Sequence, residues 1–265
     1  GAAFLEIGLE RTAFLHVSDI HGAHHDTDQT EPNIEKIITE GQKLLVKITK
    51  KPLGSKGARL TTGISITSRY LVLMPNVGNL GISQRIAVEQ EKHRLRTIIS
   101  DLAPALKTTI TSNGPDNTST TPATETENTQ AASSVANHGY IARTAAEGAS
   151  EGELSRDMTF LNRLWHSLLP RIDAAEPPAI VYEDLPLPLR VIRDLSANDS
   201  ERIRIDSNDT FHKAIQFAEK FSPDLVPLIE HYPGERPILD LYSTEDEIQR
   251  ALHRRVELKS GGHLV

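Results

Sequence analysis

One polar tract limits how the rest of this chain can fold. Residues 111–138 consist mainly of Thr, Ser, Asn and Ala, and no apolar residue recurs there at a helical or strand spacing. Such a composition cannot bury enough apolar surface to offset the entropy of ordering the backbone. We therefore expect a disordered insertion at about 111–138, with several small folded parts around it instead of one continuous core.

The first 66 residues are predicted to be rich in β-strands. Short apolar runs are separated there by Gly, Asp and Pro, and residues 33–39 have the pattern of a single helical turn. Small barrels of the OB type show this arrangement. The predicted strands cover residues 2–7, 13–17, 43–48 and 59–66.

The rest of the chain mixes helices with strands. Its strongest helix is predicted at 151–169, where apolar residues recur three and four positions apart, and Pro170 is expected to end it. Strands and helices alternate after this helix, which indicates an α/β unit and an α+β fold with several domains. The other predicted strands are 70–74, 81–85, 140–143, 180–182, 203–206 and 254–258, and the other predicted helices are 88–101, 189–195, 209–220 and 244–252.

Composition excludes some kinds of protein. The sequence has no cysteine, which rules out disulfides and cysteine-ligated metal sites within these residues. No apolar run approaches the roughly 20 residues that a membrane-spanning helix requires. The net charge of -7 indicates that nucleic-acid binding must depend on local basic patches and not on a basic surface overall.

One short motif resembles half of a metal site. Residues 16–22 have the sequence HVSDIHG, in which Asp19 and His21 follow a predicted strand, as in calcineurin-like metallophosphoesterases. Carboxylate and imidazole ligands suit a divalent metal, and three more residues of suitable type follow at 24–26. The later motifs of that class of enzyme are missing, so a polar surface loop is the competing interpretation.

Three residues of the β-rich part are candidates for nucleic-acid contact. Phe4 and Phe14 lie on neighbouring predicted strands, where they either pack in a core or form a platform on which bases stack. Lys56 lies in the glycine-rich turn 54–57, with other cations at 50, 51 and 59. This turn is either a solvated hairpin or a rim that contacts phosphates.

Arg143 and Thr144 lie at the end of the predicted strand 140–143. A guanidinium beside a hydroxyl at a strand end can grip a phosphate through bidentate, charge-assisted hydrogen bonds. An ordinary surface arginine is the alternative.

The sequence as a whole resembles the RNase E/G family of bacterial endoribonucleases, and the RNase G branch more closely. The resemblance is collinear and covers nearly the whole chain outside 111–138, which makes it more specific than any single motif. The matching segments are AFLEIG (3–8), AFLHVSDI (13–20), KPLGSKGARLTT (51–62), SRYLVLMP (68–75), GISQRI (81–86), RTAAEG (143–148), EIQRAL (247–252) and VELKSGG (256–262).

This resemblance implies a division of the chain into four parts. An OB-type RNA-binding domain would cover residues 1–62, with its first strand missing, and a 5′-end sensor would cover 63–188. An RNase H-like subdomain would follow at 189–253, and the DNase I-like catalytic subdomain would begin at 254–265.

The resemblance also implies roles for single residues. Phe4, Phe14 and Lys56 match residues of the family that bind RNA. A second set matches the site that binds a 5′ monophosphate, with a Ser at 68 where a relative has Gly. This 5′-phosphate site would comprise Arg143, Thr144, Val72 and Ser68.

No catalytic residue is expected within the chain. In the family, aspartates hold a magnesium ion that activates water, and we expect them beyond Val265, together with the Cys-x-x-Cys link that binds structural zinc. The 265 residues of this chain alone are therefore expected to bind RNA without cutting it. The alternatives are the metallophosphoesterase and a non-catalytic RNA-binding module.

The implied partner is single-stranded RNA with a 5′ monophosphate, during the processing and decay of rRNA and mRNA. The resemblance further implies a cytoplasmic bacterial protein that forms homo-oligomers when full length. Neither DNA nor a membrane is an expected partner.

Overall fold

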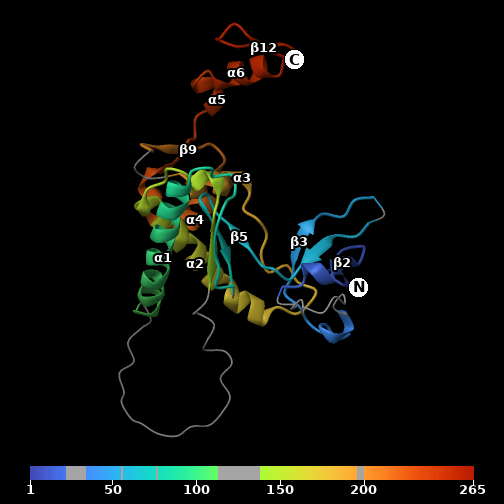
Figure 1. The fold of residues 1–265 in the computed structure, drawn as a ribbon. Helices are drawn as coiled ribbons and strands as arrows, with labels where there is room; N and C mark the ends of the chain where they lie inside the picture. The colour runs from blue at the N-terminus through green and yellow to red at the C-terminus, as the bar shows by residue number, and fades with distance from the viewer. Residues whose placement is uncertain (22–33, 55, 76, 113–137, 196–199) are drawn as a thin grey trace. The chain divides into compact units, whose positions relative to one another are not determined.

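The computed structural model shows a mixed α/β protein with helices and several small sheets, in agreement with the predicted α+β class (Figure 1). It describes residues 1–21, 34–54, 56–75, 77–112, 138–195 and 200–265. The chain divides into two compact units, residues 1–184 and 185–265, and each is described by itself. Nearly all of the predicted disordered insertion lies outside the described residues. No helix in the described ranges is long and apolar enough to cross a bilayer.

The first unit begins with a four-stranded sheet of order β1-β2-β4-β3. Its central pair, β2 and β4, is parallel, and the two outer pairs are antiparallel. Side chains alternate between its faces, so Ala13, Leu15 and Leu60 are buried together on one side. In the described part of the chain this sheet is open and not a closed barrel, and the OB-type assignment stays a prediction. The strands are β1 (Ala2–Leu5), β2 (Ala13–His16), β3 (Lys47–Lys50) and β4 (Arg59–Thr61).

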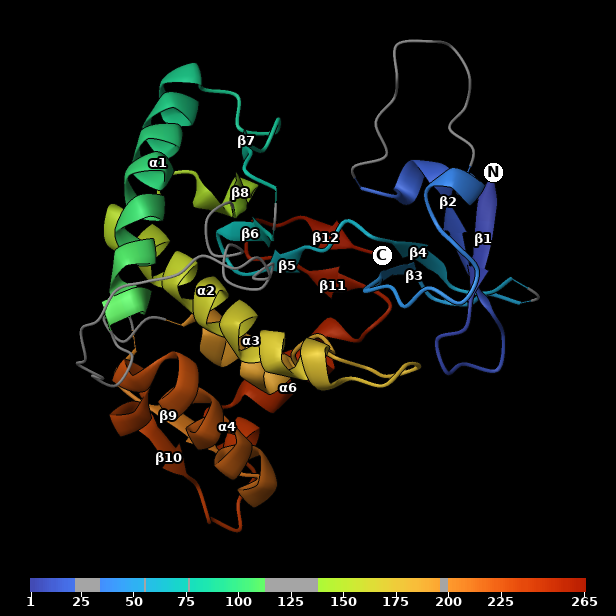
Figure 2. The ribbon, with the colours of Figure 1, turned by 90° about the horizontal axis from the view of Figure 1, so that it is seen from below.

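A second four-stranded sheet, of order β5-β6-β8-β7, has two long helices beside it (Figure 2). Helix α1 packs against β7, α2 packs against β6, and the two helices contact each other. Alternation in β6 buries Leu71 and Leu73 beneath these helices. The elements are β5 (Ile66–Thr67), β6 (Leu71–Met74), β7 (Leu80–Ile82), β8 (Gly139–Ala142), α1 (Glu89–Ser112) and α2 (Glu151–Ala174).

The sequence explains why α2 begins at Glu151. The Glu153 N–H donates to the Ser150 hydroxyl, and the Ser150 N–H donates to the Glu153 carboxylate. This capping box satisfies donors that the first turn of a helix leaves unpaired. The predicted apolar stripe of the helix is buried, and it consists of Leu154, Met158, Leu161, Trp165 and Leu168.

Two predictions of element ends are wrong in the helices. Pro170 does not end α2, which continues to Ala174. A proline removes one hydrogen-bond donor from a helix interior, and here the turns on either side form in spite of that loss. Helix α1 runs to Ser112, beyond the predicted end at residue 101.

Several strand predictions are also wrong. The single strand predicted at 59–66 is two strands, β4 and β5, which belong to different sheets. The strand predicted at 43–48 forms only from Lys47. Residues 180–182 form no strand, and Ile180 is largely exposed, because no neighbouring strand pairs with this run.

The second unit contains a β-α-β arrangement. Strands β9 and β10 pair in parallel, and α4 packs against both of them and against α3. The sequence does not predict β10, because its three residues are too few to show a period. The assignment of this unit to an RNase H-like fold stays a prediction. Its elements are α3 (Leu187–Asp194), β9 (Ile203–Ile205), α4 (Asn208–Phe221), the 3-10 helix η4 (Pro223–Leu228), β10 (Ile229–His231), α5 (Ile238–Leu241), α6 (Thr244–Ala251), β11 (Val256–Glu257) and β12 (His263–Leu264).

We predict that Gly139 cannot be replaced without loss of stability. A Cβ at this position would collide with the backbone carbonyl oxygens of Val77 and Asn79, where β7 approaches β8. Gly139→Ala should lower the free energy of unfolding by about 1–3 kcal/mol. The matched control is Gly152→Ala in α2, where the added Cβ would meet no atom within 4 Å apart from its chain neighbours and the nearby backbone of its own helix.

The control substitution should be neutral or stabilise the protein by up to about 1 kcal/mol, because alanine favours helix more than glycine does. Urea denaturation followed by circular dichroism measures both variants. Equal stability of the two variants would contradict the backbone contact described for Gly139.

Candidate nucleic-acid interface

Two phenylalanines face each other on the surface of the first sheet. Phe4 of β1 and Phe14 of β2 are direct cross-strand partners. Their ring centroids lie 6.0 Å apart in an edge-to-face arrangement. Phe4 is 73% exposed, which is unusual for a phenylalanine. The pair therefore does not form the core of this sheet.

The core lies on the opposite face. Leu15 follows Phe14 in β2 and is fully buried, as is Leu60 on the neighbouring strand β4. Because successive side chains of a strand point to opposite faces, burial of Leu15 places Phe14 on the solvent side. An aromatic pair in this position is available to stack on a planar ligand.

The basic turn near this sheet includes Lys56. Residues Leu53 and Lys56 exchange two backbone hydrogen bonds of 3.1 Å, and this exchange closes the turn. The side chain of Lys56 is exposed. Arg11 reaches the same turn, because its Nη1 donates to the Gly54 carbonyl oxygen at 2.7 Å. Both cations therefore lie at one tight turn.

The motif that resembles a metal site has another arrangement in the structure. The carboxylate of Asp19 accepts two hydrogen bonds from Arg59, at 2.9 Å from Nε and 3.2 Å from Nη2. His21 donates its backbone N–H to the Thr62 hydroxyl at 2.7 Å. A bidentate ion pair of this kind engages the carboxylate that a metal would need. The residues at 24–26 lie outside the described residues.

The described part of the chain offers no cluster of metal ligands. Residues 1–21, 34–54, 56–75, 77–112, 138–195 and 200–265 contain no group of three or more His, Asp or Glu side chains that could hold a metal ion. The described residues therefore do not fit a magnesium or zinc site, and we derive no chemical step through either ion.

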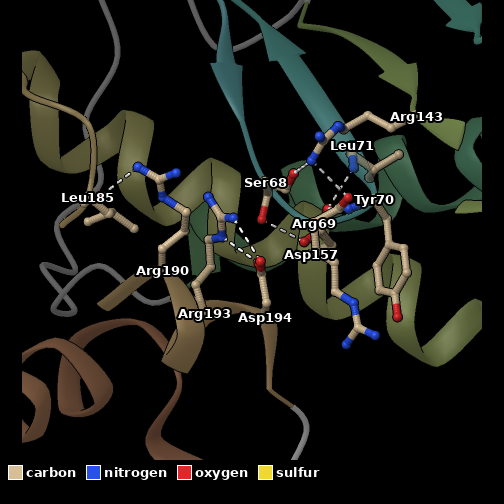
Figure 3. A network of polar contacts seen from close by, with 10 residues as sticks. All are labelled: Ser68, Arg69, Tyr70, Leu71, Arg143, Asp157, Leu185, Arg190, Arg193 and Asp194. Atoms are coloured by element: carbon tan, nitrogen blue, oxygen red, sulfur yellow. Dashed lines mark hydrogen bonds and ion pairs between the residues drawn. The ribbon is translucent and has the colours of Figure 1, made fainter. Parts of the chain in front are cut away.

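Arg143 lies at the end of β8, where a turn of the neighbouring strand holds its guanidinium (Figure 3). Nη1 of Arg143 donates to the carbonyl oxygens of Ser68 and Arg69, the second at 3.0 Å. The Arg143 backbone N–H donates to the Tyr70 carbonyl oxygen at 2.8 Å. We call residues 68–71 the arginine-holding turn. Its carbonyl groups fix the direction of a cation at the protein surface.

Thr144 follows Arg143 in the chain, and Val72 lies on the neighbouring strand β6. Thr144 begins the 3-10 helix η3 (Thr144–Ala146), and its hydroxyl oxygen lies 3.2 Å from the Ser83 hydroxyl oxygen. Val72 pairs with Ile141 in the adjacent strand and is partly buried. Arg143 and Thr144 thus both lie at the end of β8, but the Arg143 guanidinium contacts the turn before β6, whereas the Thr144 hydroxyl lies near Ser83, which follows β7.

Ser68 is also at this site, but its side chain points inward. It is fully buried, and its hydroxyl donates to the Asp157 carboxylate at 2.6 Å. Its carbonyl oxygen, not its hydroxyl, contacts Arg143.

Asp157 is a residue of this site that the sequence analysis did not identify. Its carboxylate accepts hydrogen bonds from the Ser68 hydroxyl and from the backbone N–H groups of Tyr70 and Leu71, at 2.6, 3.0 and 2.8 Å. Burial raises the pKa of Asp157, and these hydrogen bonds partly offset that rise. The signal in the sequence is an acidic residue at a position of α2 that lies among the buried residues of the helix.

A second carboxylate of α2 joins the same turn. The Tyr70 hydroxyl donates to Glu153 at 2.7 Å. Burial and this hydrogen bond raise the pKa of Tyr70 to about 12. The Ser150 N–H, together with the hydroxyls of Tyr70 and Ser150, lowers the pKa of Glu153 to about 2. The arginine-holding turn is therefore attached to α2 at two acidic residues.

Comparisons with known proteins agree with one another. A model of the Ribonuclease E/G family matches residues 65–120 and 118–265. The chain is 38% identical over 270 residues to Ribonuclease G of Escherichia coli K12, and the match covers 100% of this chain and 49% of that protein. Ribonuclease G of Haemophilus influenzae gives the same identity and coverage. Ribonuclease E of Nostoc sp. is 31% identical over 268 residues, which cover 100% of this chain and 34% of that protein. The chain spans about half the length of its Ribonuclease G relatives.

The low pKa of Glu153 predicts a pH-dependent contribution to stability. Its pKa falls from 4.5 to about 2 in the folded protein, so the ionised carboxylate stabilises the fold above pH 4.5, and this contribution is lost as the pH falls toward 2. Glu153→Gln should lower the free energy of unfolding by about 1 kcal/mol at neutral pH, since the carboxylate is partly screened by solvent.

The difference between Glu153→Gln and the parent protein should shrink as the pH is lowered through this range. Urea denaturation at a series of pH values measures it, with Glu151→Gln, an exposed residue of the same helical turn, as control. If Glu153→Gln lowers the free energy of unfolding by the same amount at every pH down to 2, ionisation of Glu153 is not the cause of the lost stability.

Proposed function

The chain belongs to the Ribonuclease E/G family, and from this we propose that it supplies the RNA-binding and 5′-end-sensing part of a single-strand-specific endoribonuclease. The observation that carries the proposal is the guanidinium of Arg143, which two carbonyl oxygens fix at the end of β8, where Thr144 is the next residue. We propose processing and decay of rRNA and mRNA as the activity of the whole protein.

The Arg143 site suits a terminal phosphate. Within the described part of the chain, the hydrogen bonds from its guanidinium to the protein use Nη1. Guanidinium groups present several N–H donors in one plane, which match two phosphate oxygens at once. Thr144 adds a hydroxyl that can donate to a third oxygen. A terminal monophosphate has three such oxygens, and a 5′ hydroxyl has none.

The aromatic pair suits the bases of an unpaired strand. Stacking of a base on an aromatic side chain contributes roughly 1–3 kcal/mol and tolerates any base, because every base has a π-face. Lys56 and Arg11 would contact the phosphates between stacked bases. Duplex RNA keeps its bases paired, so this surface favours a single strand.

The finer division of the chain also belongs to this proposal. We assign residues 1–62 to an OB-type domain, 63–188 to the 5′-end sensor, 189–253 to an RNase H-like subdomain and 254–265 to the beginning of a DNase I-like subdomain. The family match and the separate sheets of the first unit support this division.

The 5′-sensing role predicts how Arg143 affects binding. The chain should bind a short single-stranded RNA about tenfold more tightly with a 5′ monophosphate than with a 5′ hydroxyl, as a charge-assisted hydrogen bond is worth about 1.5–3 kcal/mol. Arg143→Ala should abolish this preference and leave the affinity for the 5′ hydroxyl unchanged. Fluorescence anisotropy with labelled oligonucleotides measures both affinities.

Arg143→Lys should retain part of the preference, because lysine keeps the charge but not the planar donors. The matched control is Arg163→Ala, an exposed arginine of α2. A parent protein that binds both 5′ ends equally would refute the sensor, whatever the variants do.

The stacking role predicts a different pattern for the aromatic pair. Phe14→Ala should weaken binding of both RNAs by about the same factor, roughly 5- to 100-fold, since one stacked base is lost whichever 5′ end is present. Phe14→Tyr should bind within about twofold of the parent. Val88→Ala, an exposed apolar residue that precedes α1, is the control. An unchanged affinity for Phe14→Ala would place the RNA elsewhere.

A further inference from the structure

A buried carboxylate lies beneath the turn that holds Arg143. Asp157 of α2 is only 7% exposed, at a position of the helix that apolar residues surround. Burial of a carboxylate costs free energy unless hydrogen bonds compensate for the lost water. The cost is met here by the arginine-holding turn, so the purpose of Asp157 is to be found in what that turn does.

Two consecutive peptide units of the turn connect Asp157 to Arg143 (Figure 3). In the unit of residues 69 and 70, the N–H donates to Asp157 at 3.0 Å and the carbonyl oxygen accepts from Arg143 Nη1 at 3.0 Å. In the unit of residues 70 and 71, the N–H donates to Asp157 at 2.8 Å and the carbonyl oxygen accepts from the Arg143 backbone N–H at 2.8 Å. Each unit is thus bonded to the same two residues, one at either end.

A peptide unit transmits direction from one end to the other. It is planar, and in a trans unit the N–H and the C=O point in opposite directions. Both units of the turn are trans. A hydrogen bond that fixes the N–H therefore also fixes the carbonyl oxygen, and a charged acceptor at one end strengthens the bond at the other. The position of the Asp157 carboxylate thus sets where the turn holds Arg143.

The two oxygens of Asp157 hold the whole length of the turn. Oδ1 accepts from the Ser68 hydroxyl at 2.6 Å, at the beginning of the turn. Oδ2 accepts from the backbone N–H groups of Tyr70 and Leu71, at its end. The Ser68 carbonyl oxygen is a further acceptor for Arg143 Nη1. One carboxylate therefore orients the acceptors that hold the guanidinium.

We propose that Asp157 is a positioning residue of the 5′-phosphate site, which sets the direction of the Arg143 guanidinium through the peptide units of the arginine-holding turn. The inference rests on the 5′-sensing function proposed above. It assigns the discrimination between a 5′ monophosphate and a 5′ hydroxyl to a residue that acts through another and lies beneath the surface. A guanidinium oriented before binding loses less entropy when it grips a phosphate.

Three substitutions separate the position of the Asp157 oxygens from their charge. Asparagine keeps an oxygen for the backbone N–H groups, and its amide can donate to the Ser68 hydroxyl, so the turn stays in place without a charge. Glutamate keeps the charge but is longer by one methylene, which displaces the turn. Alanine removes the acceptors altogether.

The matched control is Asn162→Ala. Asn162 is also a buried polar residue of α2, and its Oδ1 accepts from the Tyr140 hydroxyl at 2.8 Å. Its loss removes a buried hydrogen bond of the same helix without touching residues 68–71. A general loss of stability would affect this variant as it affects Asp157→Ala.

Each variant of the 265-residue chain is titrated into 3′-fluorescein-labelled oligouridylates of about ten nucleotides, with a 5′ monophosphate or a 5′ hydroxyl. Binding is measured below the melting transition of every variant. Asp157→Ala and Asp157→Glu should reduce the preference for the monophosphate from about tenfold to less than about threefold, with the affinity for the hydroxyl end unchanged. Asp157→Asn and Asn162→Ala should keep the parental preference.

Three outcomes would overturn the inference. Parental preference in Asp157→Ala and Asp157→Glu would show that Asp157 only supports the fold. An equal loss of preference in Asn162→Ala would trace the effect to stability, and a loss in Asp157→Asn would trace it to charge instead of position. A parent protein without any preference would refute the 5′-sensing function itself, whereas a preference that these substitutions leave intact refutes the role of Asp157 alone.

Discussion

The buried carboxylate of Asp157 is the interaction on which the candidate phosphate site depends. It accepts hydrogen bonds from the Ser68 hydroxyl and from backbone N–H groups of the arginine-holding turn, and the donors at residues 68, 70 and 71 would otherwise be buried without partners. Removing such a carboxylate would leave several polar groups unsatisfied, at about 1–3 kcal/mol each. Because the same turn presents its carbonyl oxygens to Arg143, the position of the guanidinium depends on a residue that it does not touch.

Under the proposed 5′-sensing role, this dependence accounts for the selectivity of a surface cation. A flexible arginine loses side-chain entropy when it binds a phosphate, whereas a guanidinium already held by two carbonyl oxygens has lost much of it on folding. The capping box of α2 adds to the same arrangement, since Glu153 both begins the helix and accepts from Tyr70. Helix formation and orientation of Arg143 therefore share residues.

The sequence could predict what depends on local pattern. The apolar stripe of α2, the strands β1 and β2 and the positions of Arg143 and Thr144 at a strand end follow from spacing and turn residues. It could not predict that β4 and β5 enter different sheets or that Asp157 lies under the arginine-holding turn. Those facts depend on pairing between segments up to 89 residues apart, which no local window contains. Nor could periodicity show that α2 would continue through Pro170.

The overall negative charge of the chain does not oppose binding of an anionic strand at these sites. Three acidic groups of the first unit are already engaged: Asp19 by Arg59, Glu91 by Arg94, and Asp157 by the arginine-holding turn. The field at a surface is set by the charges that face it and by their partners, not by the sum over the chain. Stacking of bases on Phe4 and Phe14 would depend on no net charge at all. The motif that resembled a metal site thus has a different use in the fold, because the Asp19 carboxylate forms an ion pair with Arg59.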